Sequence, residues 1–199
     1  MKVLLIGASG TIGKRLKECL ELKHELVLAG KHSGMVQLDL ANVDSIKAMF
    51  KNVGRIDAVI CVAGEAKWDQ FENMTEEDYY HGLKNKLMGQ VSLVRWGKDY
   101  VSFGGSITLT SGVLADDPVY MSTSAAMVNG ALHSFVKAVA LELDNVRVNV
   151  VCSDLVEDSY EKYKDYFPGH TPVSMKRVAD AYLKSLEGRI KGEIIRVKA

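Results

Sequence analysis

The chain has 199 residues, 47% of them hydrophobic, and its 25 basic and 25 acidic side chains leave a formal net charge of +0. This length and composition predict one domain, residues 1–199, with ample apolar material for a core. The balanced charge gives no indication of a nucleic-acid or acidic-membrane surface, and no apolar run approaches the roughly 18 residues that a membrane span needs.

The cysteines Cys19, Cys61 and Cys152 stand in apolar segments and form no CxxC pair. This pattern favours buried, reduced thiols over a disulfide framework or a zinc site, so no metal site is expected. The chain enters its first predicted strand at once, which leaves no room for a signal peptide. We therefore expect a cytoplasmic protein.

Predicted strands and helices alternate along the chain. Short apolar runs predict strands at residues 3–6, 25–30, 36–40, 56–64, 106–111, 146–152 and 193–197. Helical spacing and capping residues predict helices at 14–20, 44–50, 75–94, 122–143 and 174–188, the third with a reset near Gly82 or Gly89. Alternating βα units with buried strands predict an α/β fold, a doubly wound parallel sheet of the Rossmann type.

Three glycines, Gly7, Gly10 and Gly13, follow the first strand at intervals of three and lead into the first helix. A strand that turns on glycines into a helix directs free backbone N–H groups and the positive end of the helix dipole at one spot, which suits a phosphate. Gly7 is expected to form the tight turn, Gly10 to let the backbone approach a ligand, and Gly13 to allow close helix–strand packing. The alternative is a glycine-rich turn that binds nothing.

Taken in order, several segments resemble the short-chain dehydrogenase/reductase family over essentially the whole chain. They are Gly7-Ala-Ser-Gly-Thr-Ile-Gly13, Asp39-Leu40, Val62-Ala-Gly64, Lys86-Leu-Met-Gly89, Ile107-Thr-Leu-Thr-Ser111, Ala125-Ala-Met-Val-Asn-Gly130, Ala140-Leu-Glu-Leu143 and Arg147-Val-Asn-Val-Val151. Each is weak alone, and their order and spacing carry the resemblance. The GxxGxxG spacing is closer to the extended and atypical branches than to the GxxxGxG of the usual small members.

The resemblance implies a nicotinamide dinucleotide across the carboxyl ends of the strands. NAD-preferring members place an acid at the end of the second strand, but this chain has Gly30-Lys-His-Ser33 there. Lys31 and Ser33 suit a 2′-phosphate, so NADP is predicted over NAD, unless this segment is only a solvated turn. By resemblance Asp39 and Leu40 flank the adenine, and Ala63 and Gly64 pass beneath its ribose. The predicted cofactor-binding residues are Gly7, Ser9, Gly10, Thr11, Ile12, Gly13, Lys31, Ser33, Asp39, Leu40, Ala63 and Gly64.

In the family a Tyr acts as general acid–base, a Lys four residues on lowers its pKa, a Ser polarises the carbonyl, and an Asn lies on the preceding helix. Ser111 matches the Ser position, or is a strand-end hydroxyl. Tyr120 is the nearest acid–base candidate, but Ser124 follows it at the Lys spacing. An ungapped alignment of the downstream helix places Met121 and Ala125 at the Tyr and Lys positions, so the YxxxK signature is absent. Tyr120 is then either the proton donor or a packing residue.

Lys86 stands where the family commonly has Asn. A cation entering from that helix could take the place of the missing Lys, lower a Tyr pKa and contact a ribose or phosphate. The alternative is an exposed helix lysine. Ser111, Tyr120 and Lys86 are the predicted catalytic residues.

Other residues are expected to have packing roles. His81 and His133 lie in helix patterns, and Trp68 follows the fourth strand. Tyr160, Tyr163 and Phe167 share one face of a short charged segment, which in the family often forms a substrate lid, although such a stripe more often contacts the core. Ser153-Asp154 replaces the family's Pro-Gly beside the nicotinamide.

Three functions are compatible with these residues. The first is an NADP-dependent oxidoreductase acting on a small carbonyl or alcohol. The second is a dinucleotide-binding sensor or interaction protein without catalysis, which would explain an intact glycine loop beside a lost Tyr–Lys pair. The third, a nucleotide-sugar epimerase or dehydratase, is disfavoured by the small C-terminal portion. The resemblance also suggests a homodimer or homotetramer through the helices near 83–96 and 122–143.

Overall fold

A seven-stranded, all-parallel sheet forms the centre of the computed structural model, which describes residues 1–199. In the order β3-β2-β1-β4-β5-β6-β7, the strands span Val36–Gln37, Glu25–Gly30, Lys2–Ile6, Ile56–Cys61, Val101–Thr110, Arg147–Ser153 and Ile194–Val197. The chain builds outward from β1 to β3 and then returns to the other side of β1. The strand order therefore reverses between β1 and β4, where such sheets form a ligand crevice at their carboxyl ends. The predicted α/β doubly wound, Rossmann-type fold is confirmed.

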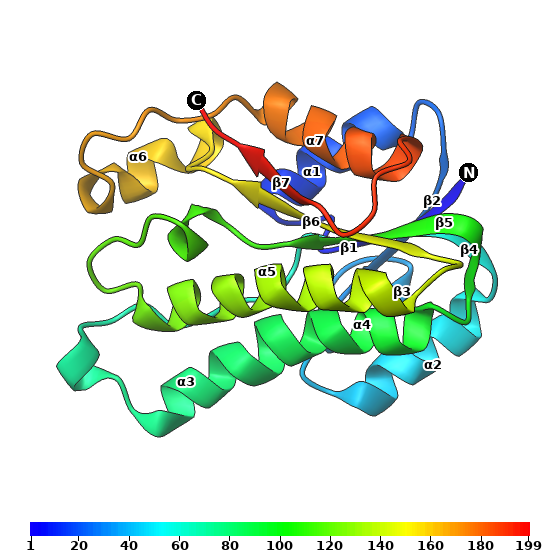
Figure 1. Ribbon diagram of the computed structural model, residues 1–199, viewed down its shortest axis with the longest axis horizontal. Coiled ribbons are helices and arrows are strands. Elements are labelled where there is room, and N and C mark those ends of the chain that lie inside the picture. The colour runs from blue at the N-terminus through cyan, green and yellow to red at the C-terminus, as the bar shows by residue number, and fades with distance from the viewer.

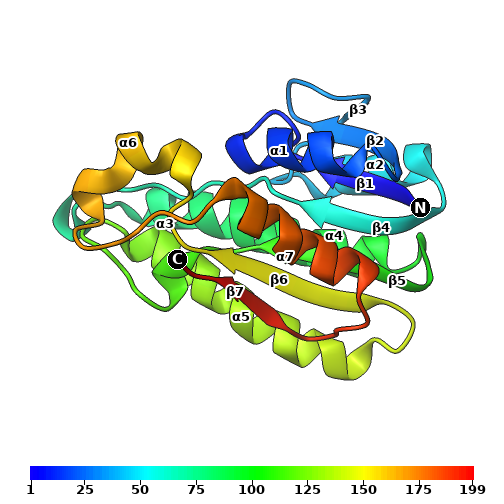
Figure 2. The same cartoon turned by 90° about the horizontal axis from the view of Figure 1, so that it is seen from above.

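Helices cover both faces of this sheet (Figure 1). They are α1 (Thr11–Leu20), α2 (Val43–Val53), α3 (Glu76–Gly82), α4 (Gly89–Gly97), α5 (Thr123–Glu142), α6 (Tyr160–Tyr163) and α7 (Met175–Glu187). Helices α1 and α7 lie together on one face, whereas α2, α4 and α5 lie on the other (Figure 2). Short α6 stands apart at the end of the sheet where the strands finish. No helix is long and apolar enough to cross a membrane.

Side chains of β1 alternate between two cores, as the pleat of a strand requires. Val3 and Leu5 are buried against α1 and α7. Leu4 and Ile6 are buried in the cluster beneath α2, α4 and α5. A strand buried on both sides has a continuous apolar sequence, which is why residues 3–6 show no polar alternation.

Helices α3 and α4 form one long rod with a π-helical stretch, Leu83–Met88, between them (Figure 1). Thr75 starts the rod with a capping box, in which its hydroxyl accepts the Asp78 N–H and the Asp78 carboxylate accepts the Thr75 N–H. The stretch is bounded by Gly82 and Gly89, the two predicted positions for a reset. A π-helical turn inserts an extra residue and rotates the side chains that follow, and such turns are frequent at functional sites.

Three predicted strand ends differ from the structure by three residues or more. Strand β5 begins at Val101, five residues before the predicted start, because a change of register in its pairing with β4 accommodates the extra residues. Strand β3 ends at Gln37 because Asp39 turns the chain, accepting the Ala41 N–H on its carboxylate. Strand β4 ends at Cys61, three residues before Gly64, where the chain leaves the sheet.

Candidate active site

A cavity of about 580 Å³ opens at the carboxyl ends of the strands. Segments from the whole chain line it: the glycine loop, the chain after β4, the π-helical stretch, the ends of β5 and β6, the start of α5, and the region around α6. Its lining residues are Ile12, Gly64, Glu65, Ala66, Trp68, Lys86, Ser111, Gly112, Val113, Leu114, Met121, Ala125, Asn129, Ser153, Asp154, Leu155, Val156, Ser159, Tyr163, Tyr166 and Phe167.

The glycine loop has the geometry predicted for it. Gly7 has φ +90°, and a Cβ there would lie 2.9 Å from the Ala63 side chain. A Cβ on Gly13 would lie 2.1 Å from the Gly7 carbonyl oxygen, so only glycine allows α1 to pack this closely. The course of the backbone therefore requires glycine at both positions, whether or not a ligand binds.

The amino end of α1 is free to bind an anion. Gly10 is the N-cap residue and supplies no side-chain cap, and the first helical bond runs from the Lys14 N–H to the Gly10 carbonyl. The N–H groups of Thr11, Ile12 and Gly13 are thus left without backbone acceptors. Donors of this kind at the start of a ten-residue helix fit a pyrophosphate. The residues present therefore fit a dinucleotide.

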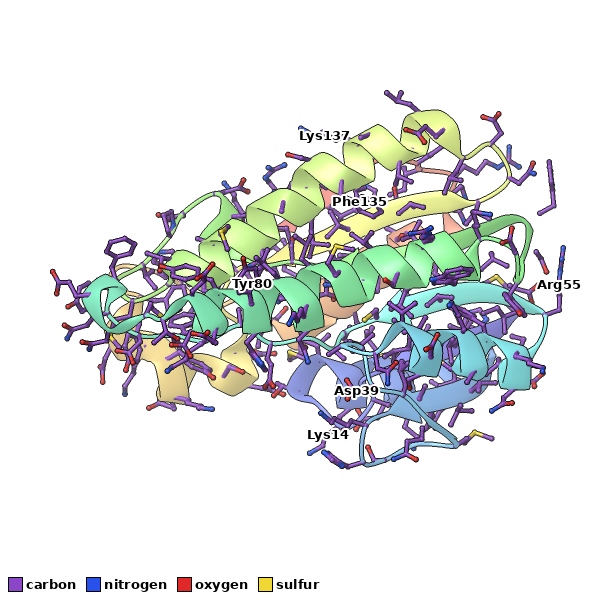
Figure 3. The ribbon with its side chains drawn as sticks, turned by 90° about the horizontal axis from the view of Figure 1, so that it is seen from below. Lys14, Asp39, Arg55, Tyr80, Phe135 and Lys137 are labelled. Carbon is purple, nitrogen blue, oxygen red and sulfur yellow. The ribbon has the colours of Figure 1, made fainter.

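Two smaller hollows continue along the edge of the sheet from the glycine loop. One of about 280 Å³ lies between Asp39, Leu40, Ala63 and Gly64. Figure 3 shows Asp39 on the same side of the molecule as Lys14 of α1. The structure therefore brings these predicted adenine-side residues together.

The second hollow, of about 400 Å³, is formed at the end of β2 by residues 30–34, 36 and 37. It contains Lys31, His32 and Ser33 and no carboxylate among its lining residues. The Lys31 ammonium also lies 3.4 Å from the Asp39 carboxylate, and both side chains are exposed. The hollow is polar, with donors available for a phosphate.

Ser111 directly follows β5, and a buried glutamine fixes this end of the strand. The Gln90 side chain pairs with the Thr110 backbone, accepting its N–H at 2.8 Å and donating to its C=O at 2.9 Å. The Thr110 hydroxyl donates to the Cys61 carbonyl and lies 2.7 Å from the Tyr182 hydroxyl. Ser111 therefore enters the cavity from a rigidly held position.

Tyr120 does not line the cavity, and it is 69% exposed. The chain takes a positive φ of 68° at Met121, which turns the Met121 side chain inward and leaves its predecessor outside. Ala125 also lines the cavity. The structure thus brings Ser111 and Lys86 together around one space but does not bring Tyr120 to them.

Lys86 projects into the cavity from the π-helical stretch, half-buried and with no hydrogen-bond or ion-pair partner. Burial lowers the pKa of its ammonium, because the charged form loses hydration. Lys84, two residues earlier, is exposed and lies over the Tyr80 ring. The alternative of an exposed lysine thus describes Lys84 and not Lys86.

Two buried polar residues of α5 near the cavity, His133 and Asn129, were not predicted as site residues. His133 is buried on α5, and its Nε2 lies 2.8 Å from the Ser111 Oγ. Asn129, one turn earlier, lines the cavity with a buried Oδ1 that has no hydrogen-bond partner. Their spacing on the face of α5 that carries Ala125 could have indicated both, but neither belongs to a recognisable motif.

An aromatic wall closes the outer side of the cavity. Trp68 lies 6.0 Å from the Tyr163 and Tyr166 rings and 6.3 Å from the Phe167 ring, measured between ring centroids. The segment around α6 therefore both packs against Trp68 and lines the cavity, so the lid and the packing interpretations describe the same residues. No group of three or more His, Cys, Asp or Glu side chains could hold a metal ion.

A family model described as Enoyl-(Acyl carrier protein) reductase matches residues 11–183. The chain belongs to the short-chain dehydrogenase/reductase family. The predicted resemblance to this family is confirmed. A hydroxynaphthalene reductase from Aspergillus fumigatus is 26% identical over 142 residues, covering 68% of this chain and 52% of that protein. Glucose and ribitol dehydrogenase homolog 2 from Arabidopsis thaliana is 28% identical over 187 residues, covering 85% and 63%. The chain thus matches about half to two thirds of the length of these relatives.

Solved structures of similar size also resemble this short-chain dehydrogenase/reductase. A crystal structure of the protein lin1944 from Listeria innocua has a TM-score of 0.97 and 42% identity, covering 99% of both chains. A small-chain dehydrogenase in complex with NADPH has a TM-score of 0.87 and 25% identity, covering 100% of this chain and 96% of that one. The family therefore includes structures that match this chain from end to end.

Proposed function

We propose that the protein is an NADP-dependent oxidoreductase that reduces a small carbonyl compound or oxidises the corresponding alcohol. Which reaction predominates depends on which of the two compounds is supplied. The observation that carries the proposal is the joining of Ile12 of the glycine loop, Lys86 and Ser111 in one cavity. A pyrophosphate on the loop would direct the nicotinamide into that space, since the dinucleotide crosses the carboxyl ends of the strands.

The polar hollow at the end of β2 supports NADP over NAD. Lys31 and Ser33 offer a cation and a donor, and none of the residues that line this hollow is an acid that could bind a ribose 2′-hydroxyl. The nearby Asp39 carboxylate lies 3.4 Å from the Lys31 ammonium and belongs to the neighbouring hollow. The similar structure described as a complex with NADPH agrees with this choice. The unpartnered Asn129 Oδ1 can accept an N–H or O–H of a bound ligand, which would remove the cost of a buried acceptor without a partner.

The aromatic wall supports an uncharged substrate with an aromatic or other flat apolar body. Trp68, Tyr163, Tyr166 and Phe167 offer ring faces, while Glu65 and Asp154 disfavour an anion. Among the relatives are a hydroxynaphthalene reductase and versicolorin reductases, names that agree with such a substrate. Ser111 would polarise the carbonyl, and the half-buried Lys86 ammonium would stabilise negative charge nearby.

Fluorescence titration with NADPH and NADH tests the cofactor, and loss of absorbance at 340 nm tests turnover. We expect tighter binding of NADPH and faster reduction of 4-nitrobenzaldehyde than of butanal or pyruvate. Preferential binding of NADH contradicts the cofactor assignment. Failure to bind either dinucleotide contradicts the whole proposal.

A second function, a dinucleotide sensor without catalysis, is favoured by Met121 and Ala125 lining the cavity where the family has its Tyr and Lys. Neither side chain can transfer a proton. The same titrations separate the two functions, because a sensor binds NADPH but turns over none of the carbonyl compounds.

A further inference from the structure

A chain of polar side chains leads from the cavity to a second, solvent-facing hollow. The Ser111 Oγ, in the cavity, lies 2.8 Å from the His133 Nε2, and the His133 Nδ1 lies 3.8 Å from an Asp116 carboxylate oxygen. Asp116 is held by a two-pronged interaction with the Arg196 guanidinium, whose Nη2 donates at 2.9 Å. Asp116 and Lys198 line this solvent-facing hollow, which has a volume of about 550 Å³ and is distinct from the one at the end of β2.

Three separate elements assemble this chain of groups. Ser111 directly follows β5, His133 lies in the middle of α5, and Asp116 follows the 3₁₀ turn Val113–Ala115. Ser111 and His133 are only 5% and 7% exposed, while the Asp116 side chain is 32% exposed. The imidazole therefore bridges a buried hydroxyl and a carboxylate in contact with solvent. An imidazole in that position can exchange a proton directly with Ser111 and, through water, with the solvent on the Asp116 side.

We propose that His133 relays protons between Ser111 and the Asp116 side of the protein, which makes Ser111 the proton donor to the substrate oxygen. The inference rests on the proposed oxidoreductase function and assigns the proton transfer that Met121 and Ala125 cannot perform. Ser111 touches the substrate and is the catalytic residue. His133 acts through it and is a positioning and proton-supplying residue.

The step balances without a further reactant. NADPH, when bound, would supply the hydride that reduces the carbonyl carbon. As the carbonyl electron pair moves to oxygen, the Ser111 O–H proton is transferred to that oxygen, and the Ser111 Oγ takes the Nε2 proton of protonated His133. Neutral His133 then recovers a proton from water on the Asp116 side. Alcohol oxidation runs the same transfers in reverse, with neutral His133 accepting the Ser111 proton.

Several groups around the imidazole set its ionisation. Burial lowers the pKa of His133, Asp116 opposes that effect, and Arg196 of β7 and Lys137 of α5 add to it. From β6 the Cys152 thiol beside Ser111 stays neutral, because burial raises its pKa. The protonated form is therefore favoured only below the ordinary histidine pKa of about 6.5. As the pH rises through the pKa of His133, the protonated form that reduction needs is lost and the neutral form that oxidation needs is gained. The rate of reduction should therefore fall, and the rate of oxidation should rise.

His133→Gln tests the relay, because glutamine retains a polar group opposite Ser111 but cannot ionise. With 4-nitrobenzaldehyde and NADPH between about pH 5 and 9, we expect kcat to fall about 100-fold and its dependence on pH to disappear. The dissociation constant for NADPH should stay unchanged. A variant that turns over with the wild-type pH profile overturns the relay while leaving the oxidoreductase function intact, whereas absence of NADPH binding in the wild type overturns the function itself.

Nitrogen-15 NMR of the histidine rings provides a test that needs no turnover. Asp116→Asn should lower the pH at which the His133 ring titrates, because it removes the carboxylate that favours the charged imidazole. Asp117→Asn is the matched control, since Asp117 lies beside His170 instead. An unchanged His133 titration in Asp116→Asn overturns the relay whatever the activity of the protein.

Discussion

A methyl group on Gly64 would lie 3.0 Å from the Cα of Lys86 and 3.2 Å from its Cγ. The chain leaving β4 therefore touches the base of the Lys86 side chain and determines where that ammonium enters the cavity. Gly64 also has φ +111°, a conformation that side chains with a Cβ rarely adopt. These two segments are 22 residues apart in sequence, and glycine is what allows them to meet.

Gly64→Ala should weaken NADPH binding because the added methyl group displaces both the chain that follows β4 and Lys86. We expect a loss of about ten-fold or more in affinity, equal to about 1.4 kcal/mol, in a fluorescence titration. Gly54→Ala is the control, since Gly54 also has a positive φ, of +69°, but has no neighbour within 4 Å. Equal losses of affinity in the two variants would show that backbone strain, and not the contact with Lys86, causes the effect.

Lys86→Ala should weaken NADPH binding more than Lys84→Ala does. Lys86 lines the cavity without a partner, whereas Lys84 is exposed. A charged group that hydrogen-bonds a ribose or phosphate contributes about 1.5–3 kcal/mol, which predicts an affinity loss of at least ten-fold for Lys86→Ala. Similar dissociation constants for the two variants would contradict a role for Lys86 in the cofactor site.

Lys86→Met should make the protein more stable at neutral pH. The pKa of Lys86 is lowered by burial, so between that pKa and the unfolded value of about 10.4 the unfolded chain binds more protons. The stability of the wild type therefore rises with pH through this window, and the advantage of Lys86→Met shrinks toward zero near pH 10. Urea unfolding at several pH values measures the difference in the free energy of unfolding between Lys86→Met and the wild type, with Lys84→Met as the control. An advantage that does not change with pH would exclude lysine ionisation as its source.

Lys31→Glu should invert the cofactor preference. A carboxylate at the end of β2 repels a 2′-phosphate and accepts a ribose hydroxyl, so affinity for NADPH should fall while affinity for NADH rises. We expect the ratio of the two dissociation constants to change about 100-fold, or about 2.7 kcal/mol. Lys23→Glu makes the same charge change at the opposite end of β2 and should leave the ratio unaltered. A ratio that stays constant in Lys31→Glu would contradict the assigned 2′-phosphate site.

The sheet and the glycine loop could be predicted from sequence because their signals are local. Residues 3–6 are apolar throughout, and glycine at position 13 is required by contacts with Gly7 and Ala8, only a few residues earlier in the chain. The predicted geometry of this loop accordingly agrees with the structure. What remains a prediction is that it binds a dinucleotide.

The proton-transfer groups could not be predicted because they depend on long-range packing. Tyr120 is the tyrosine nearest to the family position in sequence, yet the turn at Met121 leaves it outside the cavity. His133 falls in an ordinary helix pattern, and only the crossing of α5 beneath the end of β5 brings it to Ser111. Figure 3 shows α5, marked by Phe135 and Lys137, lying beside the helix that carries Tyr80. The spacing of residues in the sequence does not indicate that His133 and Ser111 come together.

Gln90→Leu should destabilise the protein and disturb the end of β5. Gln90 is fully buried, and its amide satisfies both the N–H and the C=O of Thr110, which precedes Ser111. Leucine leaves these two backbone groups without partners, at about 1–3 kcal/mol each, so we expect the free energy of unfolding to fall by about 2–6 kcal/mol in urea titrations. Gln70→Leu, at an exposed position, should change it by less than about 0.5 kcal/mol. If both variants unfold at the wild-type urea concentration, the Gln90 amide does not secure the strand end on which Ser111 depends.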